Sequence, residues 1–73
     1  MKTKKLINHQ VIQTLNNKYG LGIEVTYLIL KHNDGNANKC DDTCKFFLNL
    51  KKSGIDIYND FNNCYTKYIL SKI

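Results

Sequence analysis

The chain has 73 residues, a formal charge of +5 and no proline or tryptophan, and all eleven of its basic residues are lysine. A chain of this length forms one domain, here residues 1–73, and leaves little room for a closed catalytic pocket. The lack of arginine removes the side chain that most often reads guanine. The positive charge excludes a DNA mimic that works by presenting a negative surface.

The segment 4–19 has the clearest helical pattern. Apolar residues recur every four positions from Ile7 to Tyr19, and polar residues fill the opposite face. Gly20 stands where helices commonly end, because glycine adopts the left-handed conformation of a C-terminal cap without a steric cost. The sequence therefore predicts a helix that ends at Tyr19.

The segment 23–31 is compatible with two structures. Its β-branched residues favour a strand, but Leu28 and Leu30 would make both faces of that strand apolar. We expect a helix here and a mainly α fold, a small bundle of three or four helices. The alternative is an α+β fold in which 23–31 and 45–58 form a small antiparallel sheet.

A loop and a third helix are expected next. Residues 32–39 are dense in turn-forming residues, which is typical of a loop. Asp41 or Asp42 can cap a helix that runs to Ser53, because a carboxylate accepts hydrogen bonds from the free N–H groups of a first turn.

The last segment is expected to fold back on the third helix. Gly54 suits a Schellman ending, and Asp56 can cap a final helix. Two helices joined by so short a connection pack antiparallel. The sequence thus predicts a C-terminal antiparallel helical hairpin of residues 42–53 and 56–72.

The three cysteines bear on redox chemistry. Cys44 and Cys64 lie ten residues before and after Gly54, so the hairpin would place them opposite each other as a facing thiol pair or a disulfide. Cys40, at the end of the polar loop, is expected to be the exposed thiol. His32 and the cysteines together offer four zinc ligands, and a thiol- or zinc-stabilised module is therefore one alternative. We nevertheless expect no bound metal and no cofactor.

The odd cysteine count and the absence of a long apolar run favour a cytoplasmic chain outside the membrane. Catalytic groups are scarce, with one glutamate and no Ser-His-Asp grouping, so we expect no enzymatic activity. The residues Lys2, Lys4 and Lys5 form a basic arm suited to polyanion contact, including non-specific nucleic acid. The second alternative is accordingly a lysine-rich nucleic-acid-binding regulator, helix-turn-helix-like over 11–31.

A binding role is the main expectation. Lysine without arginine, ten asparagines and eight isoleucines indicate A/T-rich codons, and with the small size this composition is typical of accessory proteins of phages or mobile elements. Such proteins act as inhibitors or adaptors by covering a protein partner. Tyr27, Tyr58 and Tyr68 are candidate interface residues, because tyrosine is favoured at interfaces. The small core suggests a homodimer or a domain completed by its partner.

Overall fold

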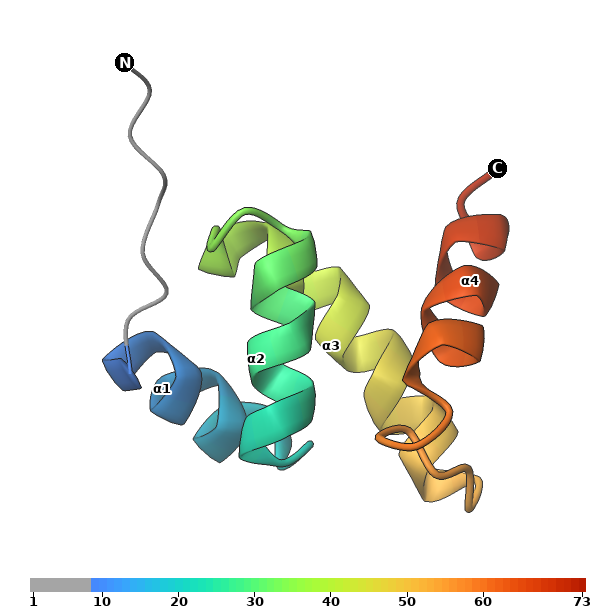
Figure 1. Cartoon of the computed structure of the whole chain (residues 1–73), viewed down its shortest axis with the longest axis horizontal. Helices are drawn as coiled ribbons and strands as arrows, with labels where there is room; N and C mark the ends of the chain where they lie inside the picture. The colour runs from blue at the N-terminus through green and yellow to red at the C-terminus, as the bar shows by residue number, and fades with distance from the viewer. Residues whose placement is uncertain (1–8) are drawn as a thin grey trace.

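The computed structural model describes residues 9–73, which form four α-helices and no strand (Figure 1). The helices are α1 (His9–Tyr19), α2 (Ile23–His32), α3 (Ala37–Lys52) and α4 (Phe61–Ser71). The predicted mainly α fold is confirmed, and the alternative with a sheet from 23–31 and 45–58 is wrong. The predicted start of the first helix, at residues 4–8, lies outside the described residues.

The segment 23–31 is helical because its apolar residues form two adjacent helical rows. The buried side chains of α2 are Val25, Thr26, Ile29 and Leu30. Their spacing of one, three and one residues is that of a helix stripe wide enough to meet two neighbouring helices. Ile23 and Tyr27 lie off this stripe and are 46% and 40% exposed, although a strand would have placed them beside Val25 and Ile29.

The helices α1, α2 and α3 each pack against the other two, and we call residues 9–52 the three-helix unit. The turn between α1 and α2 is held by the side chain of Asn16, whose Oδ1 accepts a hydrogen bond from the N–H of Gly22 at 2.8 Å. The N–H of Gly20 returns to the carbonyl of Asn16, which ends α1 where the sequence predicts. The fourth helix, α4, packs mainly on α3 (Figure 1).

The loop between α2 and α3 is shorter than the predicted 32–39, because α3 begins at Ala37. Asn36 caps this helix, and its side chain accepts hydrogen bonds from the N–H groups of Asn38 and Lys39. Asp34, with φ of 57°, ends α2 in the left-handed conformation. The helix α3 therefore begins at Ala37, four residues before Asp41, which is one of the two residues that we predicted as its cap.

The other end of α3 follows the prediction. Gly54 has φ of 89°, its N–H donates to the carbonyl of Lys51, and the N–H of Ile55 donates to that of Leu50 at 3.1 Å. These two hydrogen bonds define a Schellman motif. The chain then turns back, and α3 and α4 run antiparallel in Figure 1 as predicted.

The start of α4 differs from the prediction, because Asp56 does not cap it. The carboxylate of Asp56 accepts hydrogen bonds from the N–H groups of Tyr58 and Asn59 at 3.2 and 3.1 Å, which makes a local turn. Ile57, within this turn, is 5% exposed and belongs to the core. The helix begins only at Phe61, so the hairpin has a longer connection than the sequence indicated.

Candidate interaction surface

One row of side chains on α4 passes from the core to the surface. Phe61, Tyr65 and Ile69 follow one another at intervals of four residues along α4, and Ile73 comes four residues later, just after the helix has ended at Ser71. Phe61 is 5% exposed, Tyr65 is half-buried, Ile69 is 44% exposed and Ile73 is 95% exposed. We call this series the α4 row. Its first half is covered by the rest of the molecule and its second half is not.

Aromatic contacts cover the first half of the α4 row. The ring of His32, at the end of α2, stacks on Tyr65 with centroids 4.4 Å apart and on Phe61 at 5.6 Å. Beneath them, the fully buried ring of Phe47 on α3 lies 5.2 Å from that of Phe61. Rings at these separations gain contact energy beyond simple burial. These contacts hold the start of α4 against α2 and α3.

The second half of the α4 row has no such cover. Leu70, the next residue along α4 after Ile69, is 61% exposed. Together, Ile69, Leu70 and Ile73 form what we call the α4 apolar end. An exposed apolar patch at one end of a helix that is otherwise docked is a mark of an interaction site.

Beside the α4 apolar end, polar groups join α4 to α3. The hydroxyl of Tyr68 donates to Oδ2 of Asp42 at 3.0 Å, and Lys72 forms an ion pair with the same carboxylate. The hydrogen bond from Lys72 and then that from Tyr68 lower the pKa of Asp42. A shallow groove of about 210 Å³ lies over this contact, lined also by Phe46 and Asn49. These groups satisfy one another and fix the angle of α4.

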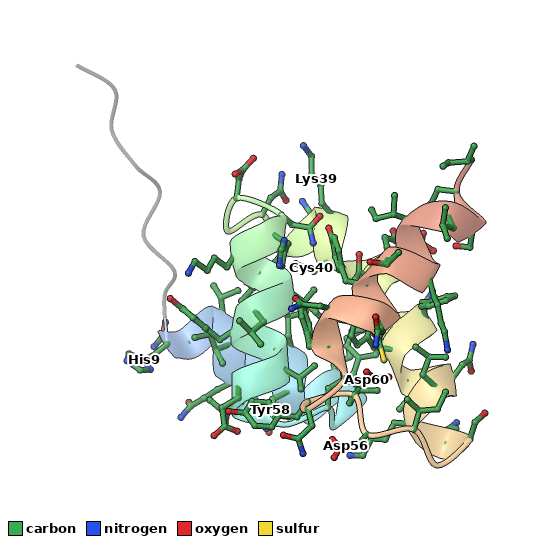
Figure 2. The ribbon with its side chains drawn as sticks, turned by 45° about the vertical axis from the view of Figure 1, so that its right-hand side comes forward. His9, Lys39, Cys40, Asp56, Tyr58 and Asp60 are labelled. Atoms are coloured by element: carbon green, nitrogen blue, oxygen red, sulfur yellow. The ribbon has the colours of Figure 1, made fainter. Side chains whose placement is uncertain are left out.

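The three candidate interface tyrosines lie in different surroundings. Tyr27 is 40% exposed on α2, and Tyr58 is 52% exposed on the connection before α4, near the end of the molecule where Figure 2 also shows Asp56. Tyr68 is half-buried against Phe46, with ring centroids 5.4 Å apart. Tyr68 thus serves the contact between α3 and α4, while Tyr27 and Tyr58 leave about half of their surface uncovered.

The prediction that Cys40 is the exposed thiol is wrong, because Cys40 is fully buried. The early start of α3 places it one helical turn before Cys44 on the inner face, where its Sγ donates to the carbonyl of Ile29 at 3.9 Å (Figure 2). Burial raises the pKa of all three thiols, that of Cys44 to about 12. A thiol in this state is a poor nucleophile at neutral pH.

All three cysteines are free, so the structure contains no disulfide. Cys44 lies near the charges of Asp41 and Lys18, towards α1, whereas Cys64 lies near those of Asp60 and Lys67 on its own segment. The facing arrangement of Cys44 and Cys64 stays a prediction. No group of three or more potential ligands within residues 9–73 is placed to hold a metal ion.

The helix-turn-helix-like segment 11–31 does form two helices joined by a short turn. The exposed face of α2 carries Ile23, Glu24, Tyr27 and Lys31. A helix that reads the major groove presents polar or cationic side chains there, so the exposed isoleucine and the anionic glutamate at the start of α2 do not favour base recognition.

The basic arm of Lys2, Lys4 and Lys5 lies outside the described residues. Residues 9–73 contain eight lysines and six acidic residues, so their formal charge is +2. Much of the positive charge of the chain is therefore carried by its first five residues. No helix within the described part of the chain is long and apolar enough to cross a membrane.

Comparisons of the chain with models of protein families, with curated proteins and with solved structures find no match in any of the three.

The sequence reasoning missed Ile69, Leu70 and Ile73. The signal was present, because Phe61, Tyr65, Ile69 and Ile73 are evenly spaced. We considered the final helix only as the antiparallel partner of the third helix. A second set of residues on α4, including Cys64 and Tyr68, is directed towards the core and α3, and the sequence does not reveal which side of the helix stays exposed.

Proposed function

We propose that the chain is a non-catalytic protein-binding module that docks on its partner through the α4 apolar end. The observation that carries this proposal is the α4 row, which begins in the core at Phe61 and continues uncovered to Ile73. A partner that lies on Ile69 and Ile73 would extend the same packing outward. By covering or recruiting a protein in this way, the module would act as an occluding factor or an adaptor.

A rival surface on α2 is less suited to this role. Ile23 and Tyr27 are exposed to about the same degree as Ile69, but they sit on a helix whose stripe is already covered by α1 and α3. Leu70 and Ile73 are more exposed than either of them. Burial of apolar surface drives association, at about 25 cal/mol per Å² removed from water. The α4 apolar end therefore has more to gain from a partner.

Site-specific photo-crosslinking in cells that produce the protein tests this proposal. A photoreactive phenylalanine analogue placed at Leu70 should trap a discrete partner, and the same analogue at Tyr58 should not, although Tyr58 is 52% exposed. Ile69→Ser should then reduce the crosslink at position 70 by about tenfold, since truncating a central interface residue commonly costs more than 1 kcal/mol.

The chain offers a closely matched control for Ile69→Ser. Ile23 is the same residue type, also on a helix surface, with 46% exposure against 44%. Ile23→Ser should leave the crosslink unchanged. Equal crosslinking at positions 58 and 70, or loss of the crosslink in Ile23→Ser rather than in Ile69→Ser, would contradict the proposal.

A further inference from the structure

We infer that the partner segment seated on the α4 apolar end is an amphipathic helix with acidic residues beside its apolar stripe. This inference rests on the proposed docking surface and adds the chemistry of its occupant. Three observations support it. They are the small area of the α4 apolar end, the α4 row that leads to this end, and three exposed lysines that form no ion pair within residues 9–73.

The small exposed area of the α4 apolar end argues against a second copy of the chain as the partner that covers it. Three partly exposed side chains offer at most a few hundred Å² of apolar surface, in the range of a single patch on a monomer. A stable interface buries about 800 Å² on each partner. In a two-fold dimer each patch would meet its own copy, so the exposed Lys67 beside Leu70 would also approach its counterpart. The occupant must therefore reach beyond the tip of α4 and carry the opposite charge.

The shape of the patch favours a helix. Side chains spaced by four residues form a ridge, and such ridges pack into the grooves between the side-chain rows of another helix. Tyr65 and Ile69 make such a ridge along α4, and the exposed Leu70 and Ile73 follow at and just beyond the end of the helix. Recognition of a helix by a row of apolar anchors is a common mode of peptide binding.

The lysines supply the charge preference. Lys18, Lys45 and Lys72 form ion pairs with Asp41 or Asp42. No ion pair within residues 9–73 involves Lys31, Lys39 or Lys67.

Lys67 lies on α4 itself, and the other two lysines are next to residues that lie near Tyr65 of the α4 row, His32 and Cys40. Lys31 is in the last turn of α2, next to the His32 that stacks on α4. Figure 2 shows Lys39 extending from the start of α3 away from the body, and in Figure 1 the start of α3 and the end of α4 both lie along the upper side of the molecule. Asp34 is the single unpaired carboxylate in the intervening turn, so the three cations outweigh it. Acidic flanks on a partner helix would complement this charge and orient the helix.

Two synthetic peptides test the inference on the full chain. Both are helical, of about 15 residues, with the same leucine stripe at intervals of three and four. One has glutamate on both sides of the stripe and the other has lysine. Binding is followed by amide chemical shifts of the ¹⁵N-labelled protein. The glutamate peptide should bind at least about tenfold more tightly and shift residues 65–73, and Ile69→Ser should weaken it about tenfold while Ile23→Ser does not.

Charge reversal provides the second measurement. In a variant with Lys31→Glu, Lys39→Glu and Lys67→Glu, the preference should invert towards the lysine peptide, since all three sites are exposed and unpaired. Added salt should narrow the difference between the two peptides.

The outcomes separate the two proposals. Equal binding of both peptides at the α4 row would overturn the acidic partner and leave the docking surface in place. If the glutamate peptide binds Ile69→Ser as tightly as the wild-type chain, charge attraction alone explains its binding, and the inference is overturned. Concentration-dependent dimerisation lost in Ile69→Ser would make a second copy the occupant and also overturn it. If neither peptide binds, the helical partner is wrong, and the crosslink at position 70 decides the docking surface by itself.

Discussion

The three-helix unit and α4 bury their apolar residues in different ways. Each of the first three helices packs against two others, whereas α4 rests mainly on α3 with one histidine ring across its start. Accordingly, α2 has four buried residues in ten and α4 has two in eleven. The two helices are similar in length, so the difference lies in the number of neighbours. A helix with apolar residues on two sides but one main neighbour leaves part of its apolar surface exposed.

The contrast also predicts which part opens first. The first half of the α4 row, the buried Cys64 and the polar contacts of Tyr68 and Lys72 join α4 to the unit. Regions with few buried contacts open with a smaller free energy than the global unfolding free energy. We therefore expect α4 to detach from the three-helix unit before that unit unfolds.

The largest expected effect comes from the ring that both regions share. Phe47 is fully buried on α3 and lies beneath Phe61. Phe47→Ala should lower the free energy of unfolding by about 3–5 kcal/mol, because it removes a large side chain and leaves a cavity. Phe46→Ala, at the half-buried neighbour, is the control and should cost clearly less in the same chemical denaturation. Similar costs for both would mean that the core does not centre on Phe47.

A smaller effect of opposite sign is expected within the three-helix unit. The hydroxyl of Thr43 is buried without a hydrogen-bond partner, as is that of Thr26. An unsatisfied buried hydroxyl costs about 1–3 kcal/mol, so Thr43→Val should raise the free energy of unfolding by about 1 kcal/mol. Thr66, whose exposed hydroxyl donates to the carbonyl of Asn62, is the control, and Thr66→Val should not stabilise the chain. Destabilisation by Thr43→Val would show that its hydroxyl has a partner in solution.

The cost of a left-handed backbone conformation can be compared at the end of α2 and the end of α3. Asp34 and Gly54 both have positive φ, of 57° and 89°. Asp34→Gly should stabilise the chain by up to about 1 kcal/mol, because glycine adopts this conformation freely, and Gly54→Ala should destabilise it by about 1 kcal/mol. Thermal unfolding measures both. A loss of stability in Asp34→Gly would indicate that the aspartate side chain contributes more than its backbone conformation costs.

The smallest effect concerns the polar join between α3 and α4. Since Lys72 and Tyr68 lower the pKa of Asp42, its contribution to stability is full above the ordinary carboxyl pKa and is lost as the pH falls through the lowered value. The protection of the α4 amides against hydrogen exchange, corrected for the intrinsic exchange rate at each pH, should therefore fall in acid more than that of the α2 amides. In Asp42→Asn this extra acid sensitivity of α4 should disappear, and its persistence would assign the effect to another carboxylate.

Sequence reasoning predicted those features that depend on local chemistry. The helix ends at Gly20 and Gly54 are set by glycine within a few residues, and both were predicted correctly. The choice of helix for 23–31 was also right, because apolar residues on both faces of a strand fit two adjacent helical rows better.

The errors arose where two residues compete for the same local role. Asn36 and Asp41 can both cap a helix, and the structure uses Asn36, which turned Cys40 from a loop residue into a core residue. Asp56 makes a turn instead of a cap, so α4 starts late. The uncovered half of the α4 row could not be predicted, because its exposure depends on how α4 is placed on α3 and the end of α2 rather than on its own sequence.

The cysteines give the most direct test of whether α4 opens separately. Cys64 lies on α4. Cys40 and Cys44 lie on α3, where Cys40 contacts Ile29 of α2 and Cys44 lies near Lys18 of α1, and all three cysteines are fully buried. A buried thiol reacts with an alkylating reagent only after local or global opening, so the rate of labelling reports the opening that exposes it. Mass spectrometry of the peptides gives the three rates in one experiment.

We predict that Cys64 is alkylated at least about tenfold faster than Cys40 and Cys44 without denaturant, with a weaker dependence on added urea, because detachment of α4 exposes less surface than global unfolding. The two α3 thiols should react together, at the rate of global unfolding. Equal rates for all three cysteines, with the same dependence on urea, would contradict this account and show that α4 and the three-helix unit unfold as one body.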